Sequence, residues 1–360
     1  MLNFNYIVKV LLFERENMSK YQIVEVGNKK KYNALSKAPS DVVKIANSDG
    51  FASKILKVKV TPDRNIFEKI IKQIIYVFKW QRMYSAFNDG DVLLLQYPSY
   101  HYQFNQYRVL AKLRQNKNMR LIFVIHDIDQ LRTNSKDRTF DQMVSVADKL
   151  ILHNKQMIKY MEGLGVNLDK MINLQIFDYL LPDYDQVKPS KFNRSVIIAG
   201  NLDSNKAGYI KDLDKINVKF DLYGAGYKAS NSSNIFYHGA LSPDKVPYSL
   251  NKGFGLVWDG DSIDSCTGLV GNYLRYNNPH KLSLYIASKL PVIIWSGAAE
   301  ADFVKKFNIG YTINSLTELP DLLKQIDKQK YDQLLKNVVN VGKKVTSGQF
   351  MCEALEQALK

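Results

Sequence analysis

Short apolar runs of strand length alternate with amphipathic stretches of helical spacing along almost the whole chain. DVLLLQYP (91–98) and RLIFVIHDID (120–129) each contain a continuous apolar run, VLLL and LIFVI. Continuous runs of this kind are typical of parallel strands, which are buried on both faces of a sheet. Further strands are expected at 21–26, 53–60, 147–154, 195–202, 218–226, 234–241, 254–261, 290–295 and 309–313. The alternation therefore predicts an α/β fold with helices on both faces of parallel sheets.

The alternation is interrupted once, in YLLPDYDQVKPSKFNRS (179–195), which has two prolines, mixed charge and no periodicity. Such a segment is typical of a linker, and 360 residues are enough for two domains. The expected organisation is an N-terminal extension (1–20), a Rossmann-like domain (21–180), a linker (181–194), a second Rossmann-like domain (195–345) and a C-terminal helix (346–360). Ligands of such sheets bind outside the carboxyl ends of the strands, so we expect the site in a cleft between the domains.

The last helix carries a single apolar stripe. Its members recur at three- and four-residue spacing and are Phe350, Met351, Ala354, Leu355 and Leu359. A stripe of this kind has to be buried against another surface. Two surfaces remain open at this stage: the N-terminal domain of the same chain, or a second subunit.

The charge of the chain favours anionic partners. The formal net charge is +15 at pH 7, but no zinc-finger, RNA-recognition or basic-zipper pattern accompanies it, so we do not expect nucleic-acid binding. Two cysteines and five scattered histidines give neither a disulfide framework nor a metal-ligand spacing. We expect a cytoplasmic protein without metal, with the anionic inner face of a membrane as a candidate peripheral contact.

The first seventeen residues, MLNFNYIVKVLLFEREN, resemble the apolar part of a signal peptide but lack a small-residue cleavage site. The first expected strand begins near Tyr21, so this segment is expected to be an extension that catalysis does not need. A short helix that touches a membrane or a partner is the alternative.

Residues 276–295, YNNPHKLSLYIASKLPVIIW, predict a loop, a short helix and a buried strand. His280 and Lys281 fall in the first turn of the helix, where the helix dipole disfavours cations by up to about 1 kcal/mol. A bound anion offsets this penalty, because backbone N–H groups and the lysine can hold it together. Phosphate is the simplest such anion, and a solvated charged turn is the plain alternative.

Glycines follow several strands of the second half, as Gly200-Asn201, Gly224-Ala225-Gly226 and Asp259-Gly260-Asp261. Small residues at strand ends let a ligand approach the backbone, although tight turns use glycine for purely structural reasons. Position 229 is alanine, so the full G-x-G-x-x-G fingerprint is absent, and no P-loop motif occurs. A nicotinamide dehydrogenase and a P-loop nucleotidase are therefore disfavoured. Asp259 and Asp261 have the spacing of a metal-binding pair, but a turn in which aspartates flank a glycine is expected.

The block NYLRYNNPHKLSLYIASKLPVIIW (272–295), with FGLVWDG before it, resembles the donor-domain signature of the bacterial glucosyltransferase-three-like family. These enzymes belong to adhesin-glycosylation and surface-polysaccharide clusters and are often labelled galactofuranosyltransferases. NALSKAPSDVVKI (33–45) and AGNLDSNKAGYI (199–210) are similar to two further segments of that family, and the resemblance spans about residues 20–345. It implies a GT-B fold, in which two Rossmann-like domains face each other, the C-terminal one binding a UDP-sugar and the N-terminal one the acceptor.

The resemblance also implies roles for individual residues. Lys281 would bind the pyrophosphate and Asn278 the UDP, with Ser36 and Lys37 at the acceptor side of the cleft. Other residues that would line the donor pocket are His280, Tyr223, Gly224, Gly226, Gly200 and Asn201. Leu284 stands where the wider GT-B group has a glutamate, so the stereochemistry stays open. The family implies no cofactor besides the UDP-sugar co-substrate, and it implies a homo-oligomer, either a dimer or a tetramer.

The expected activity is transfer of a hexose, with UDP-glucose as donor, to a sugar-bearing acceptor such as a GlcNAc-modified protein or a surface-polysaccharide intermediate. An inverting reaction needs a base in the N-terminal domain. His126 and Asp127, at the end of an expected strand, are the candidates, and a polar pair that merely ends a strand is the alternative. A non-catalytic partner protein and a UDP-sugar epimerase or phosphorylase remain as other functions for the same fold.

Overall fold

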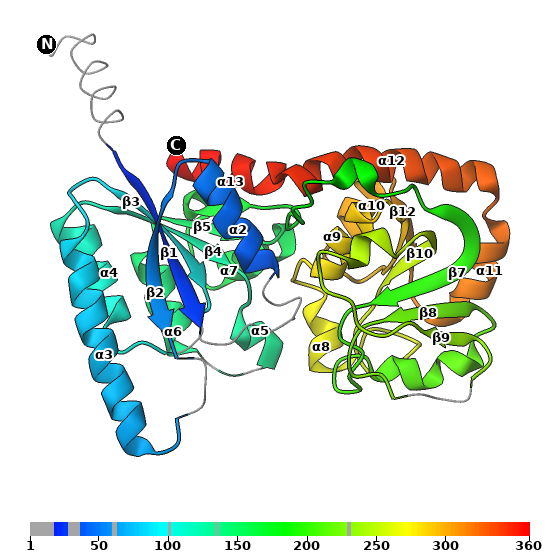
Figure 1. Ribbon diagram of the computed structural model, residues 1–360, viewed down its shortest axis with the longest axis horizontal. Coiled ribbons are helices and arrows are strands. Elements are labelled where there is room, and N and C mark those ends of the chain that lie inside the picture. Colours follow the sequence, from blue (N-terminus) through cyan, green and yellow to red (C-terminus); the bar gives the residue numbers. More distant parts are fainter. Residues whose placement is uncertain are drawn as a thin grey trace, which may run out of the picture.

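The chain folds into two α/β domains, each built on a six-stranded parallel sheet (Figure 1). This computed structural model describes residues 18–27, 37–59, 63–99, 102–133, 135, 137–228 and 232–360. Residues 1–17 and Ser36, to which the sequence analysis gives roles, lie outside the described residues. The two sheets confirm the expected pair of Rossmann-like domains.

The N-terminal sheet has the strand order β2-β1-β3-β4-β5-β6, and every pairing in it is parallel. The elements of this domain are β1 (Lys20–Gly27), α2 (Lys37–Ser48), β2 (Ala52–Val58), α3 (Ile66–Ser85), β3 (Val92–Tyr97), α4 (Gln106–Asn116), β4 (Arg120–Ile125), α5 (Asp129–Thr133), α6 (Arg138–Val146), β5 (Lys149–Leu152), α7 (Lys155–Gly163), the 3-10 helix η2 (Leu168–Lys170) and β6 (Met171–Asn173). The strand order reverses between β1 and β3, so a crevice is expected at the carboxyl ends of these two strands.

The C-terminal sheet has the order β12-β11-β10-β7-β8-β9, again wholly parallel. Its elements are β7 (Lys191–Ala199), η4 (Gly208–Lys215), β8 (Lys219–Tyr223), β9 (Ile235–Tyr237), η5 (Val246–Tyr248), β10 (Lys252–Val257), α8 (Gly268–Tyr273), α9 (His280–Ala287), β11 (Val292–Trp295), α10 (Ala301–Phe307), β12 (Gly310–Ile313), η6 (Leu316–Glu318), α11 (Leu319–Gln325) and α12 (Lys328–Ser347). Here the order reverses between β7 and β10, and β7 points towards the N-terminal domain (Figure 1).

One boundary differs from the sequence expectation. Strand β7 begins at Lys191, inside the segment expected as linker, and the rest of that segment is packed by the buried side chains of Leu181, Tyr184 and Val187. Helix α2 begins at Lys37 although Pro39 follows in its first turn, because a proline is tolerated where the helix has no N–H bond to lose.

The chain crosses back to the N-terminal domain at its end. Helix α12 runs along the C-terminal domain, and α13 (Gln349–Leu359) continues onto the N-terminal one, where it packs against α2, β5 and β6 (Figure 1). Gly348, which joins the two helices, has φ +87°, and a Cβ there would lie 2.8 Å from Ile45 of α2. The buried carboxylate of Asp178 accepts the N–H groups of Phe350 (3.3 Å) and Met351 (2.7 Å) at the start of α13. The apolar stripe of the last helix is thus covered by the N-terminal domain of the same chain.

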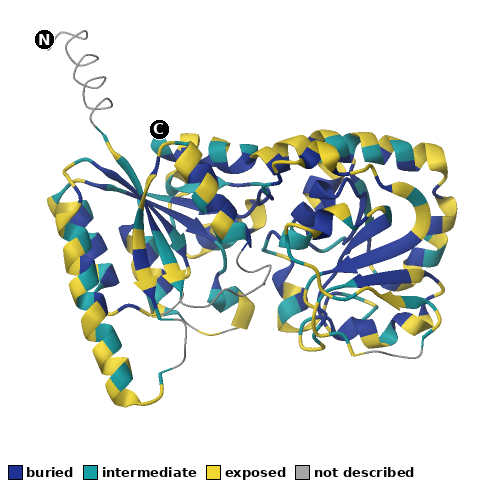
Figure 2. Ribbon diagram, viewed as in Figure 1, coloured by how far each residue is buried: buried dark blue, intermediate teal, exposed yellow. Residues whose placement is uncertain are grey.

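The apolar core is continuous between the domains on one side only. One cluster extends from the C-terminal sheet through α13 to Val92 and Leu94 of β3, on the face that α2 covers. The alternate residues Leu93 and Leu95 belong to a second cluster on the opposite face, under α3, α4 and α6 (Figure 2). Among the residues that the structure describes, no helix is both long enough and apolar enough to cross a bilayer.

Replacing Leu355 by alanine should destabilise the N-terminal domain, because Leu355 is fully buried in the interface of α13. Loss of a buried leucine usually costs about 2–5 kcal/mol. Chemical unfolding followed by circular dichroism measures this loss, and Gln357→Ala on the exposed side of the same helix is the matched control. Equal stability of the two variants would show that α13 does not contribute to the fold.

Candidate active site

Lys281 lies at the point where the C-terminal sheet reverses its strand order. From the first turn of α9 its ammonium donates to Asp259 Oδ1 (2.7 Å) and to the carbonyl of Trp258 (2.8 Å), both just beyond β10. One turn later, the Tyr285 hydroxyl accepts the N–H of Ala199 (2.9 Å) and donates to the carbonyl of Leu256 (3.1 Å). Helix α9 is therefore fixed to both strands that flank the crevice.

Lys281 is not an isolated cation in the first turn of α9, because a carboxylate lies beside it. The negative charge that offsets this cation comes in the first place from Asp259, whose carboxylate is itself buried. An ammonium group has three protons, and two of them are used here. The third remains for a ligand, so binding of an anion by Lys281 stays a prediction.

The glycines near this crevice differ in the space around them. Gly224 and Gly226 have φ +149° and +91°, and a Cβ on Gly224 would lie 1.7 Å from the carbonyl oxygen of Gly200. A Cβ on Gly226 would lie 2.8 Å from the backbone nitrogen of Asp203, so both glycines allow two strand-end loops to pack together. Gly200 has φ +138° with open space beside it. Of the three, Gly200 is therefore the one beside which a ligand has room.

Tyr223 and Asn201 complete the C-terminal side of the site. The half-buried ring of Tyr223 stacks on His238 with centroids 4.5 Å apart, and His238 Nε2 lies 2.7 Å from Asp221 Oδ1. Because these stacked rings are held in place at the end of a strand, a further aromatic ring could stack on them. The exposed Asn201 accepts the N–H of Asp203 (3.0 Å), which closes the loop after β7. Their contacts with a nucleotide stay predictions.

Asn278 joins the two domains. Its side-chain amide donates to the carbonyls of His153 (2.7 Å) and Gln175 (3.2 Å), and its oxygen accepts from Asn154 (2.7 Å). Its backbone N–H donates to His153 Nδ1 (2.9 Å). Both amide protons are used within the protein, so Asn278 positions α9 against the N-terminal domain, and a direct contact with UDP remains a prediction.

Three histidines meet around the residues that lead from one domain to the other: His153, which is buried, and His126 and His280, which are half-buried. His126 stacks on Phe177 (5.3 Å between centroids), His153 meets the same ring edge-on (4.9 Å), and His280 stacks on Tyr179 (5.1 Å). Burial lowers the pKa of His126 to about 3 and the pKa of His153 and His280 to about 4. All three are therefore neutral at pH 7.

The hydrogen bonds of these histidines leave free ring nitrogens in the cleft. Within the described part of the chain, the buried Nε2 atoms of His153 and His280 have no hydrogen-bond partner. His153 Nδ1 accepts the N–H of Asn278, so the proton of this neutral ring lies on Nε2, which is a free donor. His126 Nε2 lies 2.6 Å from Gln96 Oε1, which assigns the proton to Nε2 and leaves Nδ1 as an acceptor. Free ring nitrogens of either kind can form hydrogen bonds with ligand hydroxyl groups or water.

Asp127 is the stronger base of the candidate catalytic pair. Burial raises the pKa of its carboxyl group, while Arg132, 3.2 Å away, and the Tyr273 hydroxyl of the C-terminal domain favour the ionised form. A base works best when its pKa approaches the working pH. The low pKa of His126 makes it a poor base by this measure, so the proton-accepting role, which stays a prediction, fits Asp127 better.

Lys37 is a buried contact between the domains. Its ammonium donates to Asp41 (2.9 Å) and to the carbonyl of Leu180 (2.8 Å), and it forms an ion pair with Asp244 of the C-terminal domain (3.3 Å). It also lies over the ring of Tyr179, 4.9 Å from the centroid. These contacts hold the domains together, and direct contact with an acceptor remains a prediction.

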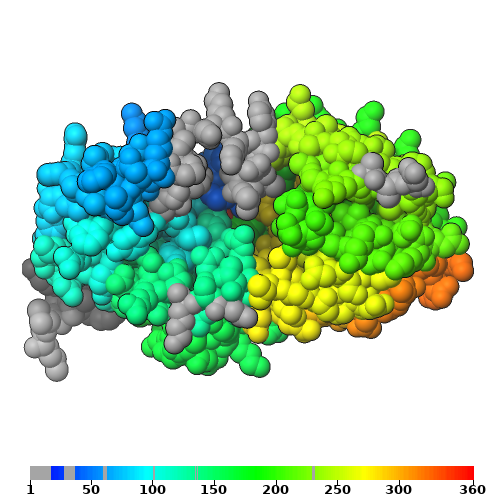
Figure 3. Space-filling view, turned by 90° about the horizontal axis from the view of Figure 1, so that it is seen from below, coloured from blue at the N-terminus to red at the C-terminus, as the bar shows by residue number. Residues whose placement is uncertain are grey.

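The surface is hollowed between the two domains, on the side to which the strands of the N-terminal sheet point (Figures 1 and 3). The candidate residues form two groups beside this cleft. Lys281, Gly200, Tyr223 and their neighbours lie at the strand ends of the C-terminal sheet. The second group lies at the domain junction and contains His126, Asp127, Asn278, His280 and Lys37.

Sequence reasoning missed several members of the site. His153-Asn154 follows β5 in the same way as His126-Asp127 follows β4, and this repeated strand-histidine pattern was the available signal. Glu300, at the start of α10, is fully buried and hydrogen-bonded to Asn154, and burial raises its pKa well above the usual range. Nothing local distinguishes Glu300 from an ordinary residue that begins a helix.

Comparison with known proteins identifies the class. Residues 20–176 match the family model for the N-terminal domain of glucosyltransferase 3-like proteins, and residues 196–358 match the model for the C-terminal domain. Beta-1,6-galactofuranosyltransferase WbbI of Escherichia coli (strain K12) is 33% identical over 81% of this chain and 86% of its own. Glucosyltransferase 3 of Streptococcus parasanguinis is 21% identical over 75% of this chain and 79% of its own.

Solved structures show the same architecture at low sequence identity. A glycosyltransferase from Rickettsia africae has a TM-score of 0.60 at 12% identity, with 95% of this chain and 99% of that chain covered. Anabaena Alr3699/HepE in complex with UDP and glucose has a TM-score of 0.58 at 11% identity, with the same coverage of 95% and 99%. Fold and relatives thus define a glycosyltransferase of the GT-B type. Within that class the chain belongs to the glucosyltransferase 3-like family, as the resemblance indicated.

The histidines predict a loss of stability in acid. His280 has a pKa of about 4 when folded against 6.5 for a free histidine, so the unfolded chain takes up a proton first as the pH falls below 6.5. Its stabilising contribution is present above this pH and is lost towards pH 4, a change on the order of 3 kcal/mol.

Urea unfolding of the wild type and of His280→Gln, at neutral pH and near pH 4.5, measures this contribution. The wild type should lose more stability on acidification than the variant. Buried carboxyl groups with raised pKa values, such as Asp178, act in the opposite direction but are common to both proteins. An equal loss in the two proteins would contradict the assignment.

Proposed function

We propose that this protein transfers a hexose from a UDP-sugar to a sugar-bearing acceptor, either a GlcNAc-modified protein or a surface-polysaccharide intermediate. The observation that carries the proposal is Lys281 at the reversal point of the C-terminal sheet, with one ammonium proton left for a ligand. Membership of a family whose relatives are glycosyltransferases supports it. So does a GT-B neighbour whose structure holds UDP and glucose.

The donor diphosphate would lie at the N-terminus of α9, against Lys281 and the open side of Gly200. Both the cation and the backbone N–H groups of the first turn stabilise the charge that develops on a departing UDP. Asp259 fixes the lysine before the donor arrives, so no reorganisation of the lysine is needed during the reaction. We propose a metal-independent reaction, because the ion pair of Asp259 with Lys281 uses the carboxylate that an Asp259–Asp261 metal site would need.

The acceptor hydroxyl would enter from the N-terminal side. Asp127 would accept its proton if the reaction inverts configuration, and the unpartnered nitrogens of His153 and His280 would bind sugar hydroxyl groups. Position 284 is a buried leucine. It therefore cannot supply the carboxylate with which the glutamate of the wider GT-B group would hold the donor sugar. A closed cleft limits hydrolysis of the donor by water.

The donor sugar has two candidates. Glucose is the sugar that the sequence analysis expects, and glucosyltransferase 3 is a relative by name. Galactofuranose is favoured by the relative at 33% identity, a beta-1,6-galactofuranosyltransferase. We further propose that the protein lies in the cytoplasm at the inner face of the membrane. We also propose that it assembles into a homo-oligomer, either a dimer or a tetramer, which sedimentation velocity would measure.

The function is tested by UDP release from UDP-glucose, UDP-galactofuranose and UDP-N-acetylglucosamine, with and without a GlcNAc-capped acceptor, each in the absence and in the presence of EDTA. One of the first two donors should give acceptor-dependent release. Binding without release would identify a non-catalytic partner protein, and a changed sugar nucleotide without acceptor would identify an epimerase. Activity that is lost in EDTA and restored by Mn²⁺ or Mg²⁺ would overturn the metal-independent reaction.

Lys281→Ala should weaken UDP binding about ten- to a hundredfold, since a charged hydrogen bond contributes about 1.5–3 kcal/mol. The variant leaves the buried carboxylate of Asp259 unpaired, so Lys281→Met with Asp259→Asn is the second variant, which removes both charges. Lys324→Ala is the control, because Lys324 is an exposed lysine of the same domain that pairs with Asp321 (3.4 Å) on α11. Unchanged UDP affinity by calorimetry in the folded variants would refute the donor site.

A further inference from the structure

Helix α3 exposes an apolar face on the outside of the N-terminal domain. Its buried residues are Tyr76 and Trp80, which pack inwards. Seven apolar side chains between Ile66 and Phe78 are each at least 46% exposed, with Phe67 and Phe78 above 70%. The helix forms the outer edge of the molecule and is exposed along much of its length (Figures 1 and 2).

The exposed residues share one side of the helix. Phe67, Ile70, Ile71, Ile74 and Phe78 recur at spacings of three and four residues, opposite the side that holds Tyr76 and Trp80. A helix of 20 residues is about 30 Å long, so the strip is long and one helix wide. A helix that is apolar on both sides is normally buried, and an exposed apolar patch of this extent marks an interaction surface.

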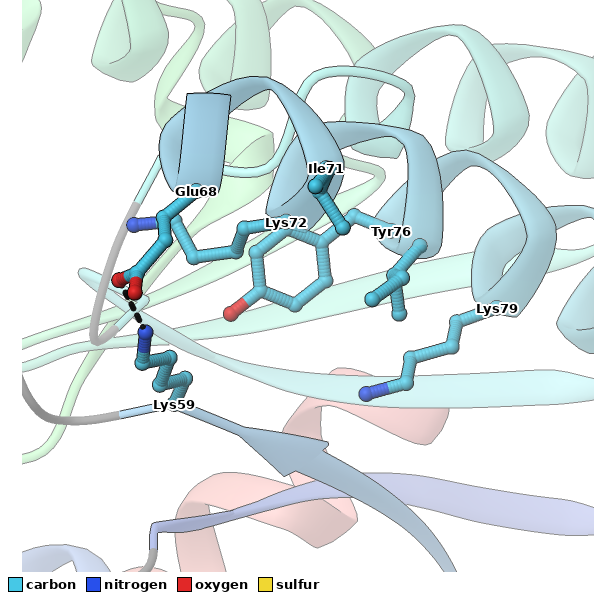
Figure 4. Close-up of a pocket in the computed structure, with 7 residues that line it drawn as sticks. Lys59, Glu68, Ile71, Lys72, Tyr76 and Lys79 are labelled. Atoms are coloured by element: carbon cyan, nitrogen blue, oxygen red, sulfur yellow. Dashed lines mark hydrogen bonds and ion pairs between the residues drawn. The ribbon is translucent and has the colours of Figure 1, made fainter. Parts of the chain in front are cut away.

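Basic residues accompany this apolar strip. The helix has Lys69, Lys72, Lys79 and Arg82 but only one acidic residue, Glu68. A hollow of about 280 Å³ beside it, between α3 and the end of β2, is lined by Lys59, Lys72 and Lys79 together with Glu68 (Figure 4). Lys59 pairs with Glu68 (2.9 Å) and Lys72 with Asp63 (2.5 Å), so cations exceed carboxylates at this surface.

We propose that α3 docks the N-terminal domain on an anionic lipid bilayer. The apolar strip would enter the boundary between headgroups and acyl chains, and Lys69, Lys79 and Arg82 would face lipid phosphates, as in interfacial amphipathic helices. The charge balance favours a bilayer over a second copy of the chain. Twofold pairing through α3 would bring two sets of the same cations together, whereas anionic lipids complement them.

Docking through α3 would specify the acceptor more closely. The N-terminal domain is the side from which the acceptor would enter, so this surface would bring the enzyme to a glycan carried on a membrane lipid. This extension depends on the proposed transferase function, whereas the docking itself does not.

Co-sedimentation of the full chain with lipid vesicles tests the docking. The wild type should bind vesicles of phosphatidylcholine and phosphatidylglycerol, less so at high salt, and should not bind phosphatidylcholine alone. Phe67→Glu with Phe78→Glu should weaken binding by about tenfold or more. The matched control is Leu164→Glu with Leu168→Glu, two exposed leucines elsewhere on the same domain. Residues 1–17 are present in every protein, so a difference between the variants reports on α3.

Vesicle binding is independent of turnover, so its result separates the docking from the transferase function. Failure of the wild type to bind anionic vesicles, or equal binding by the two double variants, would overturn the docking. A wild-type oligomer that the α3 variant converts to a monomer, without lipid binding, would identify α3 as a subunit interface instead. With an active enzyme, the α3 variant should lose turnover on a lipid-linked acceptor in vesicles but not on a soluble one.

Discussion

The hydrogen bonds of Asn278 are the contacts on which the arrangement of the site depends. One side chain at the entry to α9 binds the ends of β5 and the segment after β6 in the other domain. Hydrogen bonds between buried groups are directional, and leaving one unmade costs about 1–3 kcal/mol. The start of α9, with Lys281, is therefore held in one orientation towards His126 and Asp127. Apolar contact alone would allow the two domains to slide.

The cleft combines paired cations with neutral rings. Each of its two lysines, the buried Lys37 and the half-buried Lys281, has a carboxylate partner of its own, Asp41 for Lys37 and Asp259 for Lys281. The histidines between them are uncharged because burial lowers their pKa values. A donor diphosphate would therefore add negative charge to a site whose own charges are already balanced. Binding then relies on preorganised donors, which need not be rearranged when charge develops on the leaving group.

Much of the fold could be predicted because it depends on local patterns. Continuous apolar runs give the parallel strands, and the block 276–295 gives α9 and β11 close to their observed bounds. The contacts of the site could not be predicted in the same way. The contact of Lys281 with Asp259 joins residues 22 positions apart, and that of Asn278 with His153 joins residues 125 positions apart, so only the tertiary structure reveals them. The resemblance to a family gives candidate residues for the site, but not which of them bind one another.

The packing of α13 on the N-terminal domain affects how that domain folds during synthesis. The N-terminal domain is synthesised before the C-terminal one, yet α13, which covers part of it, is made only after the C-terminal sheet and its helices. Until residues 349–359 leave the ribosome, the apolar surface under α13 has no cover from its own chain. Exposed surface of this kind makes folding intermediates prone to aggregate. The N-terminal domain is thus completed only after the C-terminal domain has been translated, and its uncovered apolar surface stays accessible during that time.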